Sequence, residues 1–313
     1  MINKKIDHSC PRPKVVVLLA TYNGEQWLNE QIKSIINQEN VETRVLVSDD
    51  GSSDSTVQIV TGYIGTGLVE LLPKSKTRFG SACANFLHLI ISANLGNAEY
   101  VALSDQDDLW FPGKLFRAIS VLGQKSAGAY SSDVEAFWSN GKAKIIRKSQ
   151  KQKRLDYLFS SPSPGCSFLF RRDVFNSVRS WLSAIELEAA KIRWHDWLLY
   201  AFVRSQGIDW YIDDYISLKY RQHRGNDTGA NCGIRGKFWR LWFLIRGDYF
   251  REVLKISAVV PVVCEDVLRL KRLNIKDRLW LVCRASDYRR EAIGVGVLMF
   301  AFLVCKKTRC EKR

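Results

Sequence analysis

The chain has 313 residues, of which 46% are hydrophobic and 25% are charged, and its formal net charge is +15. This composition is typical of a folded globular protein and excludes an intrinsically disordered chain. No apolar run reaches the roughly 18 residues that a spanning helix needs. The polar N-terminus has no signal-peptide core, and the eight cysteines have no metal-type spacing, so we expect reduced thiols in a cytoplasmic protein.

Strands and helices are predicted to alternate in the first half of the chain. Continuous apolar runs predict strands over 15–20, 44–48, 69–72 and 100–103. Helical spacing predicts helices over 25–38 and 82–93, with further helices starting at Ser53 or Asp54 and at Pro112. This βαβαβαβ order indicates an α/β fold, an open parallel sheet with helices on both faces.

The second half is less regular. It is predicted to contain a strand pair, or a strand and a turn, over 130–138, a basic loop over 147–154 and a short strand over 166–170. A helix over 194–206 and a strand over 208–212 follow, and then a loop over 221–233. The last predicted helices cover 238–245, 249–256, 262–273 and 278–285. We therefore divide the chain into a polar tail (1–13), a catalytic domain (14–230) and a basic helical region (231–313).

Polar clusters follow three of the predicted strands. They are Thr21–Glu25, Asp49–Asp50 and Asp105–Asp108. Ligands bind at the carboxyl ends of strands in open α/β sheets, so these clusters should lie at one site. Taken singly, each is also explained as a strand-to-helix turn.

The segment Ser104–Trp110, SDQDDLW, carries three carboxylates directly after an apolar strand. Such crowded negative charge is costly unless hydrogen bonds or a cation compensate it. Mg2+ or Mn2+ would do so, with substrate phosphates completing the coordination shell. The alternative for a lone D-x-D is a solvated acidic turn.

The ordered motifs ATYNGE, VSDDGSSD and LSDQDDLWFPGKL resemble those of the family 2 glycosyltransferases, inverting enzymes of the GT-A fold. The D-x-D spelling, HDW at 195–197 and YRQHRGN at 220–226 are most similar to the bacterial rhamnosyltransferase branch. The resemblance covers roughly residues 14–230. It implies a Rossmann-like open sheet, mixed or parallel, with the basic helical region as a C-terminal extension.

The resemblance also implies roles at matching positions. Asp50 would bind the donor's base, with Arg78, a weaker match, near the nucleotide, and Asp105 would contact the ribose or the metal. The remaining donor-pocket positions are Thr21, Tyr22, Asn23 and Glu25. Asp107 would be the direct metal ligand.

Two positions later in the chain complete the implied site. Asp196 would be the catalytic base, with Trp194 and Trp197 raising its pKa, although a helix cap is the simpler alternative. His223 would be a third metal or diphosphate contact, and a structural hydrogen bond explains it equally well. His195 is expected to pack or to donate a hydrogen bond, and Trp110 to lie in the core or to stack on a sugar.

The implied function is an inverting, metal-dependent transfer of L-rhamnose from dTDP-L-rhamnose to a lipid-linked or cell-surface glycan, as in O-antigen, lipopolysaccharide or capsule synthesis. The same fold using a UDP-hexose donor is the nearest alternative. A basic nucleic-acid-binding protein is a remote one, because no helix-turn-helix, zinc or RNP signature is present. The Q-x-x-R-W element of processive synthases is absent.

The positive charge is concentrated at the C-terminus. From Ala230 onward there are 19 Lys and Arg residues against 8 Asp and Glu residues. The run 292–305 is apolar, is too short to span a bilayer, and lies between basic residues. We expect either a peripheral contact with the inner face of the plasma membrane or a helical subdomain packed on the catalytic core.

Overall fold

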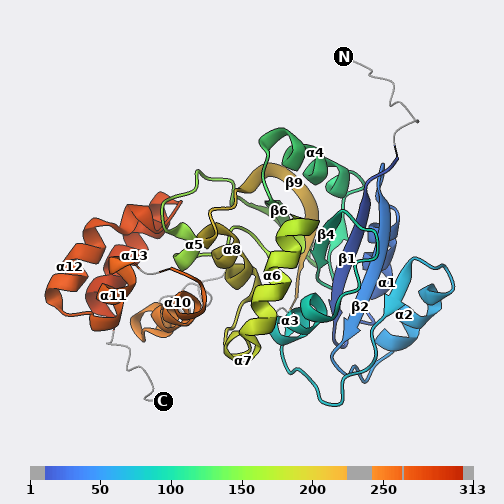
Figure 1. Cartoon of the computed structure of the whole chain (residues 1–313), viewed down its shortest axis with the longest axis horizontal. Coiled ribbons are helices and arrows are strands. Elements are labelled where there is room, and N and C mark those ends of the chain that lie inside the picture. The colour runs from blue at the N-terminus through green and yellow to red at the C-terminus, as the bar shows by residue number, and fades with distance from the viewer. Residues whose placement is uncertain (1–10, 224–241, 263, 306–313) are drawn as a thin grey trace.

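The computed structural model describes residues 11–223, 242–262 and 264–305. The predicted domain boundary at 230 and the first part of the predicted helix over 238–245 lie outside these residues. Within them, nine strands form one mixed sheet in the order β3-β2-β1-β4-β8-β6-β9-β5, with β7 paired to β6. Helices cover both faces of the sheet, which confirms the predicted α/β class (Figure 1).

The four parallel strands of the sheet are those predicted from the sequence. It comprises β1 (Lys14–Thr21), β2 (Glu42–Asp49), β3 (Val69–Leu71) and β4 (Tyr100–Ser104). Each strand lies within two residues of its predicted bounds. Successive side chains of a strand point to opposite faces. Val16 and Leu18 accordingly enter one hydrophobic core and Val15 and Val17 the other, which explains the continuous apolar run.

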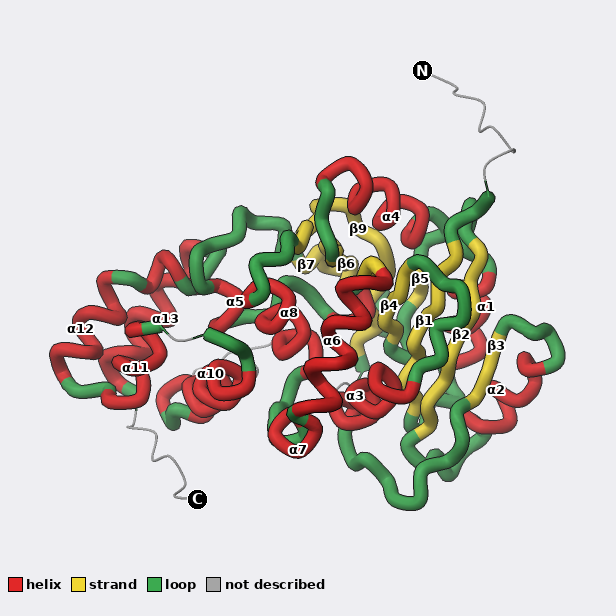
Figure 2. Tube along the Cα trace, in the orientation of Figure 1, coloured by secondary structure: helices red, strands yellow, loops and turns green. Residues whose placement is uncertain are grey.

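Two helical layers enclose these strands (Figure 2). On one face lie α1 (Leu28–Ile36), α2 (Thr56–Ile64) and α4 (Lys114–Lys125); on the other lie α3 (Ala82–Ser92), α6 (Arg172–Ala184) and α8 (His195–Ser205). The predicted start of α2 at Ser53 or Asp54 was wrong by two to three residues. Asp54 instead accepts hydrogen bonds from the backbone N–H groups of Glu25 and Thr56.

The second half of the sheet departs from the prediction. It contains β5 (Leu109–Trp110), β6 (Ala129–Trp138), β7 (Ala143–Ile146) and β8 (Leu169–Arg171). A 3-10 helix covers residues 165–167 and so replaces the first two residues of the strand predicted over 166–170. The predicted strand over 208–212 overlaps the start of β9 (Trp210–Gln222), which continues into the first two residues of the loop predicted over 221–233. The pairing of β9 with β6 contains two shifts of register. The apolar pattern of β9 is therefore interrupted, and the short apolar run over 208–212 does not indicate how long the strand is.

The remaining helices form one end of the molecule, opposite α2 and β3 (Figure 1). They are α5 (Asp156–Phe159), α10 (Asp248–Val259), α11 (Glu265–Arg272), α12 (Ile275–Cys283) and α13 (Ala292–Val304); the short α7 (Glu186–Ala189) follows α6. Tyr249 of α10 donates a hydrogen bond to the carbonyl of Phe159 and stacks on Trp197 at 5.7 Å. These helices therefore share a hydrophobic core with α8. Within the described residues no helix is both long and apolar enough to cross a bilayer.

Candidate active site

A cleft with a volume of about 350 Å³ lies at the carboxyl ends of the parallel strands. It is bounded by the ends of β1 and β2, the β4–β5 turn, the start of α3, the start of α8 and the end of β9. Eight predicted site residues line it: Thr21, Tyr22, Asp50, Arg78, Asp105, Asp107, Asp196 and His223. Residues from six separate segments therefore meet in one crevice.

Asn23 and Glu25 are not among the residues that line the cleft. Asn23 Oδ1 accepts a hydrogen bond from the backbone N–H of Ser53 at 2.9 Å, and Glu25 Oε2 accepts one from that of Ser55 at 2.9 Å. Asn23 has a positive φ of 46°, a conformation that asparagine tolerates. Both side chains join the loop after β1 to the loop after β2, which is a structural contact.

The two carboxylates after β2 have different partners. Asp49 accepts hydrogen bonds from the backbone N–H groups of Gly51 and Ser52, and so it caps the turn. Asp50 is buried at the cleft, where it accepts hydrogen bonds from the backbone N–H groups of Phe79 and Gly80. Arg78 lies 3.8 Å from Asp50 and 4.0 Å over the Tyr22 ring. Asp50 thus holds the 78–80 segment against the edge of the sheet that borders the cleft.

Strand pairing brings His223 to the acidic turn. Residues 105–108 lead directly into β5, and β5 pairs antiparallel with β9, Leu109 opposite Lys219 and Trp110 opposite Leu218. The last residues of β9 therefore run back alongside the turn. His223 Nε2 lies 2.6 Å from Asp107 Oδ2 as a result.

Arg221 makes two hydrogen bonds to the same turn and a third to Glu30 of α1. Its backbone N–H donates to Asp108 Oδ1 at 3.1 Å, its Nε to the Asp107 carbonyl at 2.8 Å, and its Nη2 to Glu30 at 2.7 Å. The sequence motifs predict no separate role for Arg221. Its position between Asp107 and Asp108 makes it a positioning residue for the acidic turn.

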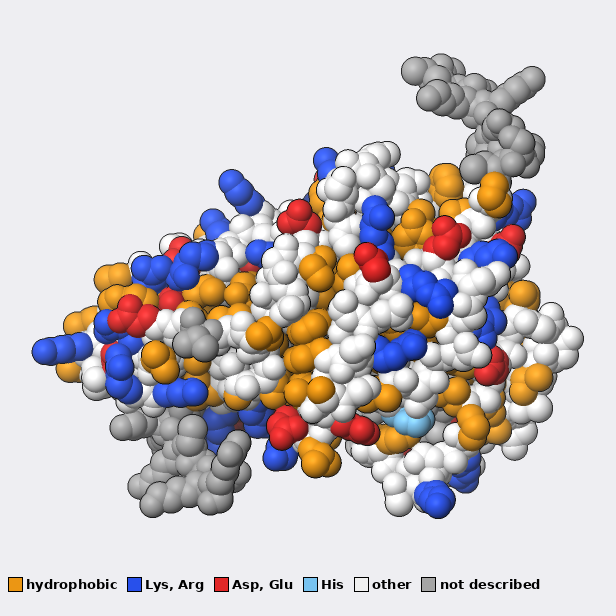
Figure 3. Space-filling model, viewed as in Figure 1, with side chains coloured by type: hydrophobic (Ala, Val, Ile, Leu, Met, Phe, Trp, Pro, Cys, Tyr) orange, Lys and Arg blue, Asp and Glu red, His pale blue; other side chains and the backbone are white. Residues whose placement is uncertain are grey.

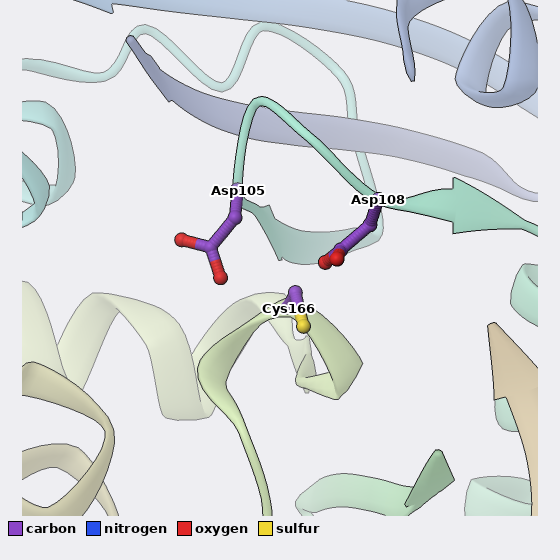
Figure 4. Close-up of side chains that lie close together, drawn as sticks. All are labelled: Asp105, Asp108 and Cys166. Atoms are coloured by element: carbon purple, nitrogen blue, oxygen red, sulfur yellow. The ribbon is translucent and has the colours of Figure 1, made fainter. Parts of the chain in front are cut away.

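Asp105 and Asp108 face each other across Cys166, with ligand atoms all within 4.8 Å of one another (Figure 4). Asp108 is buried, and its Oδ2 has no hydrogen-bond partner among the described residues. Burial, and after it the charges of Asp107 and Asp105, raise the pKa of Asp108. Burial and the Asp108 charge also raise the pKa of the Cys166 thiol. Three carboxylates at one turn, with Asp108 Oδ2 unpartnered among the described residues, fit a hard divalent cation, with His223 beside Asp107.

Trp110 lies in the core and not in the cleft wall, which decides between the two predicted roles. The Lys114 Nζ sits 3.5 Å from the centre of its ring, and burial lowers the pKa of this lysine to about 7. The residues that follow the acidic turn are therefore anchored by the packing of Lys114 on Trp110.

Asp196 lies in the first turn of α8 and lines the same cleft as the acidic turn. Its Oδ1 accepts a hydrogen bond from the backbone N–H of Trp197 at 2.8 Å. Trp197 packs against Trp194 and donates its own indole N–H to the carbonyl of Tyr157. Burial in these surroundings raises the pKa of Asp196, as predicted from its aromatic neighbours.

His195 packs, as expected, and is not placed to act as a charged group. Its ring stacks on Phe86 of α3 with ring centres 4.1 Å apart, and burial lowers its pKa to about 3. Gly165 makes room for this ring, because a Cβ there would lie 2.5 Å from His195 Nε2. His195 therefore presents a neutral imidazole to the cleft beside Asp196.

Sequence reasoning missed two amides that shape the cleft. Gln106 pairs with both backbone groups of Tyr22, at 2.8 and 2.9 Å. Asn85 Nδ2 donates to the carbonyls of Thr21 and Ser48, which end β1 and β2. Neither role can be predicted from the sequence, because the local pattern around a Gln or Asn does not show which distant backbone groups its amide will bond.

Comparison with known proteins identifies relatives for both the sequence and the fold. The family model described as glycosyl transferase family 2 matches residues 16–179. A dTDP-rhamnosyl transferase, RfbG of Shigella flexneri, is 37% identical over 241 residues, which is 76% of this chain and 83% of that protein. The glycosyltransferase EpsE of Bacillus subtilis is 31% identical over 35% of this chain and 38% of its own length.

Solved structures share the fold at low sequence identity. S. aureus TarS in complex with UDP-GlcNAc has a TM-score of 0.56 and 15% identity, covering 88% of this chain and 80% of that one. The mannosyltransferase PcManGT of Pyrobaculum calidifontis, in complex with GDP-Man and Mn2+, has a TM-score of 0.52 and 15% identity, covering 93% and 88%. These similarities confirm the predicted fold class.

Proposed function

We propose a specific reaction for this chain, which belongs to glycosyl transferase family 2: the transfer of L-rhamnose from dTDP-L-rhamnose to a hydroxyl of a lipid-linked or cell-surface glycan. The observation that carries the choice of donor is the 37% identity to a dTDP-rhamnosyl transferase over most of both chains. The convergence of the acidic turn and Asp196 on one cleft supports the mechanism that follows.

The donor nucleotide would lie along the ends of β1 and β2. Asp50 would meet the base and Asp105 the ribose, with Arg78 and Tyr22 closing the side of the pocket. Asp105 and Asp107, with His223, would hold a Mg2+ or Mn2+ ion, which supplies charge stabilisation for the departing diphosphate. Asp108 and Arg221 keep this turn in shape from behind.

Asp196 would act as the base. The acceptor oxygen forms a bond to the anomeric carbon as the bond from that carbon to the diphosphate oxygen breaks. The acceptor proton passes to the Asp196 carboxylate, and dTDP leaves. Attack from the face opposite the diphosphate inverts the anomeric centre. The raised pKa of Asp196 makes its carboxylate a stronger base than a solvated one.

A donor panel tests the assignment. Purified protein with Mn2+ and an extract containing lipid-linked glycans should release dTDP from dTDP-L-rhamnose and little nucleotide from UDP-glucose or UDP-GlcNAc. The metal assignment predicts that EDTA abolishes release and that added Mn2+ or Mg2+ restores it. Preferential turnover of a UDP-hexose would contradict the rhamnose assignment while leaving the family intact.

We place the reaction at the cytoplasmic face of a membrane in this proposal, because a lipid-linked acceptor would be anchored there. NMR of the product should give an anomeric configuration opposite to that of the donor. Retention of configuration would contradict the role of Asp196 as a base acting on the acceptor.

A further inference from the structure

The helix α13 is apolar on every side. Its sequence from Ala292 to Val304, AIGVGVLMFAFLV, contains no charged or strongly polar side chain. One side is buried in the core through Leu298, Ala301 and Phe302, and the Phe302 ring stacks on Phe250 at 5.1 Å. A helix that is hydrophobic all round is normally buried all round. We therefore expect the exposed side of α13 to contact a partner outside this chain.

The exposed side of α13 is a continuous stripe. Ile293, Val297, Phe300 and Val304, here called the α13 stripe, recur at intervals of four, three and four residues, which places them on one face of a helix. Ile293 is 83% exposed and Phe300 is 47% exposed. Exposed apolar residues scattered singly are ordinary, but a helix-long row of them marks an interaction surface.

The neighbouring helix α12 extends this apolar surface and carries basic side chains. Arg278 of α12 donates hydrogen bonds to the carbonyls of Phe302 and Leu303 near the end of α13, which joins the two helices. Ile275 and Leu279 of α12 are exposed.

Exposed lysines lie close in sequence to the apolar residues of α12, and the sequence that follows Cys305 is basic. Lys271 and Lys276 are exposed on α11 and α12, and the sequence after α13 reads KKTRCEKR. Figure 3 shows hydrophobic side chains lying among Lys and Arg side chains over this end of the molecule.

We propose that the α13 stripe and the exposed residues of α12 dock this protein on an anionic lipid bilayer. A 13-residue helix is about 20 Å long, shorter than the roughly 30 Å hydrocarbon core, so α13 fits the interface and not a span. A second copy of the chain is a poor match, since it would bring two strongly basic surfaces together. Anionic headgroups complement the lysines, and the acyl boundary complements the stripe.

Vesicle sedimentation tests this with the full chain. Vesicles of phosphatidylcholine with phosphatidylglycerol should carry down the protein, and pure phosphatidylcholine vesicles should carry down far less. The double substitution Ile293→Gln with Phe300→Gln should lower the apparent affinity about tenfold or more, since it removes two apolar side chains from the contact. Lys271→Gln with Lys276→Gln should reduce the preference for anionic vesicles.

Leu187→Gln is the matched control, because Leu187 is 79% exposed on α7, away from α12 and α13. It should bind vesicles like the parent protein. Equal binding by the parent and the Ile293/Phe300 variant would overturn the proposal. A second result would also overturn it. In that case the parent protein would be a dimer in analytical ultracentrifugation, and the Ile293/Phe300 variant would be a monomer with unchanged vesicle binding.

The vesicle assay contains no donor or acceptor, so its outcome is independent of the proposed rhamnosyl transfer. Release of dTDP in detergent should be unchanged in all these variants.

Discussion

The two acidic walls of the cleft are built in opposite ways. The turn at Asp105–Asp108 is packed with hydrogen-bonding partners, from Arg221 behind it to His223 beside it. Asp196 instead lies between two tryptophans in the sequence that contact each other, and it accepts hydrogen bonds from the backbone N–H of Trp197 and from the Ser161 side chain. The first arrangement fixes the Asp107 and Asp108 carboxylates through residues of other segments, whereas Asp196 is held mainly by its own helix; burial raises the pKa of both Asp108 and Asp196. In the proposed mechanism, the same residue type would serve metal binding on one wall and proton transfer on the other.

The largest effect should come from the wall of Asp196. Asp196→Asn keeps the shape and removes the base, so turnover of dTDP-L-rhamnose should fall by about 10²–10⁴-fold. Binding of dTDP with Mn2+ should be unchanged. Steady-state dTDP release measures the first, and calorimetry the second. A variant with ordinary turnover would show that another group takes the proton.

The same substitution should stabilise the fold. Burial raises the pKa of Asp196 in the folded state, so the protonated form is favoured there, and this stabilising contribution is lost as the pH rises through the folded pKa. Asn resembles the protonated form at every pH. The melting temperature of Asp196→Asn at neutral pH should therefore exceed that of the parent, and a lower value would argue against a strained carboxylate.

A smaller effect is expected behind the acidic turn. Arg221→Ala removes the side-chain bonds to the Asp107 carbonyl and to Glu30, so the turn should lose its position and metal-dependent donor binding should weaken about 10–100-fold. The change should appear in KM for donor and metal more than in kcat. Arg44→Ala is the control, because Arg44 makes an ion pair of similar length with Glu70 at the edge of the sheet. Equal loss in both variants would mean a general loss of stability.

The pH profile sharpens the contrast between the walls. Because the pKa of Asp196 is raised, kcat/KM should fall about tenfold for each pH unit below that pKa, as the base becomes protonated. His195 should not contribute, since its pKa is lowered to about 3 and it stays neutral over this range. Residual activity of Asp196→Asn should lack this acidic limb. Persistence of the limb in that variant would assign it to a different group.

The smallest effect should come from the two predicted donor residues outside the cleft. Asn23 and Glu25 bond to the loop after β2 and are not among the cleft-lining residues. Glu25→Gln should change the KM for the donor by less than about twofold. Loss of the hydrogen bond to Ser55 should instead lower the free energy of unfolding by roughly 1 kcal/mol. A large rise in KM with unchanged stability would return Glu25 to the donor pocket.

The sequence predicted features that depend on short-range pattern. The strands β1 and β4 were found within two residues, because a strand buried on both faces is continuously apolar. The clustering of Asp50 and Asp107 followed from the same pattern, since parallel strands end at one edge. The position of Asp196 in the first turn of α8 rested on the motif around it.

Long-range pairing was beyond prediction. The return of β9 beside β5 decides that Arg221 and His223 reach the acidic turn, and this pairing joins residues about 110 positions apart. The start of the predicted loop, at Arg221, was wrong for the same reason. The end of β9 is set by its pairing with β6 and β5, and such pairing leaves no local signal in the sequence. The stacking of His195 on Phe86 likewise depends on how α3 and α8 pack.

The most direct test of the two-wall account is a calorimetric titration of dTDP with Mn2+ into the parent, Asp107→Asn and Asp196→Asn proteins. The account predicts that Asp107→Asn loses Mn2+-dependent binding, while Asp196→Asn binds dTDP as the parent does. Loss of binding in both variants, or in neither, would contradict a division of the cleft into a donor-holding wall and a proton-accepting wall.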